Sequence, residues 1–207
     1  MITLYHYLHC PFCVRVRLVL GFLEIPYKSV VLDYDDESTP VELCGKKMLP
    51  LIKNIDGSTM NESLDIMSIL DKDNRLSPNK DISSFIKELG SNVHPLAMPY
   101  FIYTPEFNDK SRKYFQEKKE AYKGPFKQMY KNREQYLIGL NKSLNSLEQL
   151  LDPFYESDKI THEDILIASH LWGMYIVPEF QFSDIVHSYL QKVKHLCRFE
   201  YHKESWE

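Results

Sequence analysis

Cys10-Pro11-Phe12-Cys13 follows the short apolar run Ile2-Thr3-Leu4-Tyr5 and precedes a helical pattern that begins at Val14. A strand that leads into a Cys-x-x-Cys at the start of a helix is typical of a dithiol redox site. The free backbone N–H groups of a helix N-terminus stabilise an anion, so a thiol placed there loses its proton more readily and becomes a nucleophile. Cys10 is therefore the candidate nucleophile. Cys13 lies one turn further along, close enough to form a disulfide with it.

The alternative for the same tetrapeptide is half of a zinc site. A structural zinc site usually has four ligands in two spaced pairs, whereas Cys44 and Cys197 stand alone in this sequence. His6 and His9 would have to complete the set, and we expect His6 on a strand rather than on a ligand turn. The pattern therefore favours redox chemistry over zinc.

The composition excludes several classes of protein. The chain has 207 residues, 43% hydrophobic and 26% charged, which is ordinary for one large or two small globular domains. A net charge of −4 gives no sign of nucleic acid or a membrane as partner. We see no signal-peptide pattern and no apolar run near the roughly 18 residues that span a bilayer. Four cysteines do not make a secreted disulfide scaffold, so we expect a cytoplasmic protein.

The N-terminal part, residues 1–73, is predicted to fold in the order βαβαββα. Val14, Leu18 and Phe22 recur at helical spacing. Asp56-Gly57 is a favoured two-residue hairpin turn, and Pro50, which lacks an N–H, is expected at the start or edge of a strand. The predicted elements are a strand at 2–6, a helix at 11–24, a strand at 27–32, a short helix between Thr39 and about Cys44, a hairpin at 51–61 and a helix that begins near Ser63.

The remainder is predicted to be a linker at 74–84 and an all-helical domain at 85–207, with five or six helices. Leucines repeat by three and four from Leu137 to Leu151, which predicts a long amphipathic helix closed by Asp152-Pro153. Pro95 and Pro99 are expected to kink or interrupt the following stretch, from Leu96 to Tyr103. Another helix is expected to begin at Thr161 as its cap, with Asp164 reaching back.

The element order and the cysteine pair together resemble a glutaredoxin and the N-terminal domain of the glutathione-transferase-fold superfamily. The stretches His9-Cys10-Pro11-Phe12-Cys13, Met48-Leu49-Pro50-Leu51-Ile52 and Arg112 to Ala121 are similar to the bacterial two-domain glutaredoxins of the glutaredoxin-two type. The resemblance implies a thioredoxin-like N-terminal domain, a helical C-terminal domain and glutathione as co-substrate. The commonest motif of that type has Tyr where this chain has Phe12, and we expect a modest effect on ligand contact.

The same resemblance implies a glutathione site. Pro50 would be a cis-proline, and the backbone of Leu49 would pair with the cysteinyl backbone of glutathione. Glu62-Ser63 matches the acidic-Ser pair used for the γ-glutamyl end, where a helix N-terminus offers a carboxylate site and Glu62 would accept the ammonium group. The alternative is that Ser63 is only a helix cap. The expected site residues are Cys10 and Cys13 as catalytic residues, and Pro11, Phe12, Met48, Leu49, Pro50, Glu62 and Ser63 for glutathione, with no metal.

The predicted function is that of a glutathione-dependent thiol–disulfide oxidoreductase. The Cys10 thiolate would reduce protein–glutathione mixed disulfides and protein disulfides, with Cys13 resolving the latter. The expected partners are glutathione and disulfide-containing or glutathionylated proteins, and the expected state is a monomer. The alternatives are a glutathione transferase or dehydroascorbate reductase of the omega-like type, and an iron–sulfur cluster-binding module in which Cys10 and glutathione bridge a cluster.

The remaining histidines, arginines and cysteines differ in what their positions imply. His9 either favours the neighbouring thiolate as a cation or is a surface-exposed loop histidine. Arg15 and Arg17 are expected to add positive potential at the active site. Cys44 and Cys197 are expected to be small buried apolar residues. No catalytic role is expected for the histidines on predicted helices, which are His94, His162, His170 and His187.

Overall fold

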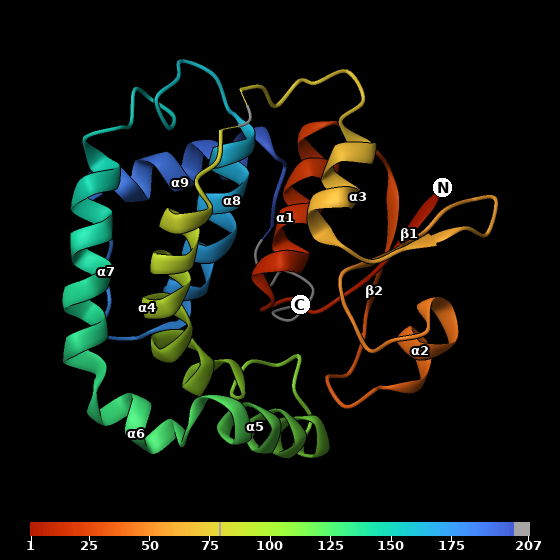
Figure 1. The fold of residues 1–207 in the computed structure, drawn as a ribbon, viewed down its shortest axis with the longest axis horizontal. Helices are drawn as coiled ribbons and strands as arrows, with labels where there is room; N and C mark the ends of the chain where they lie inside the picture. Colours follow the sequence, from red (N-terminus) through yellow and green to blue (C-terminus); the bar gives the residue numbers. More distant parts are fainter. Residues whose placement is uncertain (79, 201–207) are drawn as a thin grey trace.

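The computed structural model describes residues 1–78 and 80–200, so position 79 of the predicted linker and residues 201–207 of the predicted helical domain lie outside it. A small sheet with its helices lies beside a bundle of helices (Figure 1). The N-terminal part has the predicted order βαβαββα. Its elements are β1 (Ile2–His6), α1 (Pro11–Phe22), β2 (Tyr27–Val31), α2 (Ser38–Cys44), β3 (Leu51–Lys53), β4 (Thr59–Met60) and α3 (Ser63–Leu70).

The four strands form one mixed sheet in the order β2-β1-β3-β4. The central strand β1 runs parallel to β2 and antiparallel to β3, and its register pairs Tyr5 with Leu51. Because Leu51 is the first residue of β3, this register brings the segment just before it, Leu49-Pro50, next to the end of β1. The chain leaves β1 at that same end to enter the cysteine motif. The topology therefore gathers two predicted site segments at one edge of the sheet.

The helical part contains six α-helices and one 3-10 helix among the described residues. They are α4 (Ser83–Phe101), α5 (Asp109–Lys123), α6 (Phe126–Lys131), α7 (Arg133–Glu148), α8 (His162–Leu171), the 3-10 helix η1 (Trp172–Ile176) and α9 (Asp184–Leu196). From Glu163 onward every residue of α8 is buried, so it forms the centre of the bundle. Within the described part of the chain, no helix combines the length and apolar character needed to cross a membrane.

The two parts share one core, because α1 packs against α3 on one side and against α8 on the other. Val14, Leu18 and Val19 of α1 belong to the same buried cluster as the apolar residues of the helical bundle. The α1 backbone also approaches the end of α9 closely: a Cβ added at Gly21 would collide with the backbone carbonyl of Cys197. The helix that carries the cysteine motif is therefore held from both domains.

Two expectations about helix boundaries differ from the structure. Of the two outcomes expected at Pro95 and Pro99, a kink or an interruption, the interruption is wrong, because α4 continues through both prolines to Phe101. Each proline removes one backbone donor, but α4 packs on α7, α8 and η1, and this burial outweighs the loss. The helix α7 ends at Glu148, before the expected stop at Asp152-Pro153.

The expected start of α8 is confirmed. The carboxylate of Asp164 accepts hydrogen bonds from the Thr161 backbone N–H at 2.7 Å and from the Thr161 hydroxyl at 2.8 Å. The same carboxylate accepts from the Tyr189 hydroxyl at 2.9 Å, which joins α8 to α9. The buried Asp164 side chain thus serves both the local helix cap at Thr161 and the distant contact with Tyr189.

Candidate active site

Cys10 occupies the N-cap position of α1 in an extended conformation, and Pro11 stands in the first turn. The missing N–H of Pro11 costs little there, because that donor would have no partner within the helix. The backbone N–H groups of Phe12 and Cys13 hydrogen-bond to the Cys10 sulfur. Cys10 is partly exposed, whereas Cys13 is fully buried beneath it, and both are free thiols. The local geometry is that of an anion held by a helix N-terminus.

The two sulfurs differ in their affinity for a proton. A hydrogen bond from the Cys13 thiol lowers the pKa of Cys10, and the charge of His9 and the two backbone N–H donors act in the same direction, against the effect of burial. Burial and the neighbouring Cys10 thiolate raise the pKa of Cys13. Cys13 also accepts a hydrogen bond from the Tyr7 N–H at 3.5 Å. The pair therefore favours a thiolate on Cys10 and a thiol on Cys13.

His9 is not a surface-exposed histidine; it is only 7% exposed. Its Nδ1 lies 3.0 Å from Oε1 of Glu106, a residue in the loop between α4 and α5. The other carboxylate oxygen of Glu106 accepts a hydrogen bond from the Leu8 backbone N–H at 2.9 Å. The side chains of Phe101 and Phe107 pack around the imidazole with ring centroids 5.1 Å away. A carboxylate of the helical domain thus holds the segment that leads into Cys10.

Sequence reasoning missed Glu106 for a clear reason. It stands 97 residues from His9 in the chain, in a loop without a recognisable motif. No periodicity or spacing relates the two positions. Only the docking of the two domains brings them together.

The two arginines that follow the motif have different surroundings. Arg15 is 5% exposed, and its guanidinium lies 4.8 Å from the Phe12 ring centroid. Burial lowers the pKa of Arg15 to about 10, and attraction to Cys10 opposes that shift. Arg17 donates a hydrogen bond to the backbone carbonyl of Glu200 at 2.8 Å. Arg15 is therefore the arginine that interacts electrostatically with the Cys10 thiolate.

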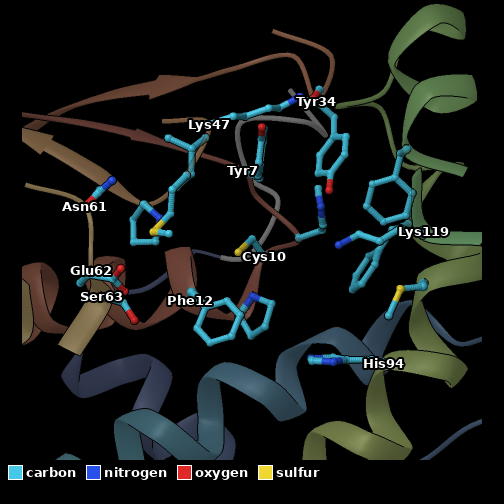
Figure 2. Close-up of a pocket in the computed structure, with 18 residues that line it drawn as sticks. Tyr7, Cys10, Phe12, Tyr34, Lys47, Asn61, Glu62, Ser63, His94 and Lys119 are labelled. Atoms are coloured by element: carbon cyan, nitrogen blue, oxygen red, sulfur yellow. Dashed lines mark hydrogen bonds between the residues drawn. The ribbon is translucent and has the colours of Figure 1, made fainter. Parts of the chain in front are cut away.

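A cavity of about 430 Å³ opens above Cys10 (Figure 2). The peptide bond between Leu49 and Pro50 is cis, as the resemblance implied. Ser63 is the first residue of α3, and Glu62 is its N-cap. The Ser63 hydroxyl makes no capping hydrogen bond and instead accepts one from Arg15 at 3.5 Å, so the simple cap interpretation is wrong. The predicted residues that line the cavity are Cys10, Pro11, Phe12, Met48, Leu49, Pro50, Glu62 and Ser63; Cys13 does not line it.

The remaining walls come from residues outside the expected set of site residues. From the sheet domain they are Tyr7, His9, Tyr34, Lys47 and Asn61, and from the helical domain they are His94, Met98, Phe101, Phe115 and Lys119. Burial raises the pKa of Tyr7 and of Tyr34, so both remain neutral phenols. Burial lowers the pKa of Lys119, and the attraction of Cys10 opposes this. The cavity is therefore built by both domains and is largely aromatic on its helical side.

The other two cysteines differ from each other. Cys197 is fully buried in the core, as expected. Cys44 is half-buried and hydrogen-bonded: its thiol donates to the Pro40 carbonyl at 3.1 Å, and its sulfur accepts from the Asn61 amide at 3.2 Å. Across residues 1–78 and 80–200, no group of three or more histidine, cysteine, aspartate or glutamate side chains is arranged to hold a metal ion.

Comparison with known proteins gives concordant results. The model "Glutaredoxin 2, C terminal domain" matches residues 81–204, and "Glutathione S-transferase, N-terminal domain" matches residues 4–78. Glutaredoxin 2 of Escherichia coli strain K12 is 29% identical over 185 residues, which covers 84% of this chain and 85% of that protein.

Solved structures agree with these matches. Glutaredoxin 2 from Salmonella typhimurium, crystallised in complex with glutathione, superposes with a TM-score of 0.89 at 27% identity over 99% of this chain and 98% of that one. A glutathione transferase from Phanerochaete chrysosporium, GSTFuA3, has a TM-score of 0.80 at 15% identity over 96% and 98% of the two chains, and shows a likeness of fold alone.

Proposed function

The chain belongs to the glutaredoxin 2 family, whose C-terminal domain model matches well over half of it, and we therefore infer that it is a glutathione-dependent thiol–disulfide oxidoreductase. The observation that carries this conclusion is the state of the Cys10 sulfur. It lies at the N-terminus of α1, receives hydrogen bonds from Cys13 and two backbone N–H groups, and opens onto a cavity. A thiolate held in this way is a nucleophile toward disulfides.

We propose that glutathione binds in the 430 Å³ cavity with its sulfur beside Cys10. The Salmonella relative was crystallised with glutathione, which supports this choice of ligand. In the proposed pose the Leu49 backbone pairs with the cysteinyl backbone, while Ser63 and the N-terminus of α3 bind the γ-glutamyl carboxylate. Glu62 accepts the γ-glutamyl ammonium group. The walls are formed by the remaining predicted residues, Pro11, Phe12, Met48 and Pro50.

The proposed reaction has two halves. The Cys10 thiolate attacks the glutathionyl sulfur of a mixed disulfide; a new S–S bond forms on Cys10, and the protein sulfur leaves as a thiolate that takes a proton. The thiolate of a second glutathione then attacks the bound glutathionyl sulfur. This step releases glutathione disulfide and regenerates the Cys10 thiolate. The cavity contributes orientation, because one sulfur must face the other in line for exchange.

For a protein disulfide we propose a second route. Cys10 forms a mixed disulfide with one protein sulfur, and Cys13 loses its proton and attacks the Cys10 sulfur. The protein leaves reduced, and the Cys10–Cys13 disulfide is then reduced by two glutathione molecules, which leave as glutathione disulfide. The raised pKa of Cys13 supports its later role, because it remains a thiol until the mixed disulfide has formed.

The finer statements about partners and organisation are also proposals. We propose glutathionylated and disulfide-containing proteins as substrates, a monomeric state and a cytoplasmic location. We propose a division into a thioredoxin-like domain at 1–73, a linker at 74–84 and a helical domain at 85–207. The gap between α3, which ends at Leu70, and α4, which begins at Ser83, supports this division.

The test is replacement of the nucleophile. Cys10→Ser should abolish reduction of a mixed disulfide between glutathione and a small thiol, assayed with glutathione as reductant. The exposed variant Lys113→Ser serves as control and should keep wild-type activity. Retained activity of the Cys10→Ser protein would show that Cys10 is not the nucleophile. Conjugation of a chlorinated aromatic, faster than disulfide reduction in the wild type, would favour the transferase alternative.

A further inference from the structure

The reaction proposed above needs a proton donor in its first half and a proton acceptor in its second. The sulfur that departs when Cys10 attacks takes up a proton, and the second glutathione loses one before it attacks. The departing sulfur is still inside the cavity when its negative charge develops, and an uncompensated anion is unfavourable there. One side chain that gives a proton and later takes one back would serve both halves.

Lys119 of α5 extends from the helical wall into the cavity, with its amine toward Cys10 (Figure 2). The two residues line the same cavity, and the charge of the sulfur acts on the lysine. Glutathione in the proposed pose lies against the sheet side, at Leu49, Glu62 and Ser63. The helical side, where Lys119 lies, is therefore open to the group that departs.

The surroundings of the Lys119 amine leave its protons free for a ligand. The amine lies over two aromatic rings, 5.4 Å from the ring centroid of Phe115 and 5.8 Å from that of Tyr34. In the described part of the chain no carboxylate forms an ion pair with it, whereas Lys110 on the same helix is paired with Asp35 at 2.7 Å. An ammonium group held over ring faces keeps its N–H donors for a sulfur atom.

The electrostatic environment makes this lysine a better proton carrier than an exposed one. Burial lowers the pKa of Lys119 below its usual 10.5, the attraction of the thiolate opposes this, and the charges of Lys118 and Lys123 add to the lowering. Two other ionisable groups face the amine: burial raises the pKa of Tyr34 and lowers that of His94 to about 4. A group whose pKa lies closer to the working pH gives up and regains a proton more readily.

We propose that Lys119 is a catalytic acid–base residue that carries the proton between the two halves of the reaction, a role that rests on the function proposed above. In the first half the Cys10 thiolate bonds to the glutathionyl sulfur, the old S–S bond breaks, and the departing sulfur takes a proton from the Lys119 ammonium group. Lys119, now a neutral amine, takes the proton of the incoming glutathione thiol. That glutathione thiolate attacks the sulfur bound to Cys10, glutathione disulfide leaves, and both side chains return to their starting states.

The test varies the acidity of the sulfur that leaves. Glutathione mixed disulfides with 2-mercaptoethanol, a weakly acidic alkyl thiol, and with thionitrobenzoate, a strongly acidic aryl thiol, are compared in a single turnover. Mass spectrometry after rapid quenching follows glutathionylated Cys10. Lys119→Arg keeps the positive charge but cannot give up a proton. It should slow the alkyl substrate by about tenfold or more and the aryl substrate by less than about twofold, since an acidic thiol leaves without a proton donor.

Lys113→Arg is the matched control, because Lys113 is exposed on the same helix and does not line the cavity. It should leave both rates at the wild-type value. Equal slowing of both substrates by Lys119→Arg would overturn the proposed role, and so would no slowing of either. In both cases glutathionylated Cys10 still forms; its absence from the wild type with both substrates would instead overturn the proposed function.

The pH profile of the wild type gives a second test that needs no substitution. With the alkyl substrate the rate should rise near pH 6 as Cys10 loses its proton, and should fall again as Lys119 loses its own, at a pH below 10.5. With the aryl substrate the rate should rise and then stay level. A level profile for both substrates up to pH 10.5 would refute Lys119 as the proton donor.

Discussion

The two sides of the active-site cavity differ in how they act on Cys10. The thioredoxin-like side acts through bonds to the sulfur itself: the N–H groups of α1 and the Cys13 thiol all lie within four residues of Cys10. The helical side supplies neither of the two reacting sulfurs. It supplies Glu106, which holds His9, and Lys119 together with an aromatic wall. The chemistry is thus encoded locally, while its electrostatic environment depends on how the domains dock.

Replacing Cys13 alters the thioredoxin-like side of the cavity, and we expect it to have the largest effect on activity. Cys13→Ser should eliminate reduction of protein disulfides, because no resolving thiol remains, and should spare deglutathionylation. Assays with a protein disulfide and with a glutathionylated peptide separate the two reactions. Equal loss of both activities would contradict the division of labour between the cysteines.

A companion variant isolates the hydrogen bond from the resolving role. Cys13→Ala removes the donor to the Cys10 sulfur, whereas Cys13→Ser retains a hydroxyl donor. The pKa of Cys10 should therefore rise more in the alanine variant, since that hydrogen bond is the largest cause of its lowering. Thiolate ultraviolet absorbance as a function of pH measures both. An unchanged pKa in Cys13→Ala would show that the helix N-terminus alone sets it.

The pH dependence of Cys10 reflects the combined effect of both sides of the cavity on the pKa of this thiol. The pKa of Cys10 is lowered from 9.0 to about 6, so alkylation of this thiol should rise with pH up to about 6 and then level off. Its folded-state pKa is depressed, so the thiolate contributes stability that is complete above the unfolded value and is lost as pH falls from about 9 to about 6. As the pH rises from about 6 to about 9, the free energy of unfolding of the wild type should therefore increase relative to that of Cys10→Ser. Denaturant unfolding at several pH values checks the sign, and a gain below pH 6 alone would contradict it.

Glu106→Gln tests the remote side without disturbing the local one. Glutamine keeps an acceptor for the Leu8 N–H but replaces the charged partner that holds the His9 ring in place, so the attraction of His9 for the thiolate falls. We expect a rise in the pKa of Cys10 by up to about one unit, with the unfolding midpoint nearly unchanged. Glu117→Gln, on the exposed face of α5, is the control. In the double variant with His9→Gln the two effects should not add, since both act through one pair.

This contrast also explains what the sequence could predict. The order βαβαββα, the α1 start at Pro11 and the cap at Thr161 depend on residues within a few positions of one another, and the structure has all three. His9 was open to a surface interpretation because its burial depends on Phe101, Phe107 and other side chains of the distant helical domain. The continuous helix through Pro95 likewise reflects tertiary packing that overrides a local rule. Local spacing carries no information about such contacts.

Phe12 stands where the two sides meet and gives the smallest effect. Its ring is 44% exposed, lies under the Arg15 guanidinium and meets the edge of the His170 ring at 6.2 Å. Phe12→Tyr restores the hydroxyl of the commoner motif without changing the ring, so the KM for glutathione should change by no more than about threefold, which is the worth of one exposed hydrogen bond. The pKa of Cys10 should stay constant, because Phe12 contributes to it through its backbone N–H. A large shift in that pKa would mean that the ring, rather than the backbone, couples the helical domain to the sulfur.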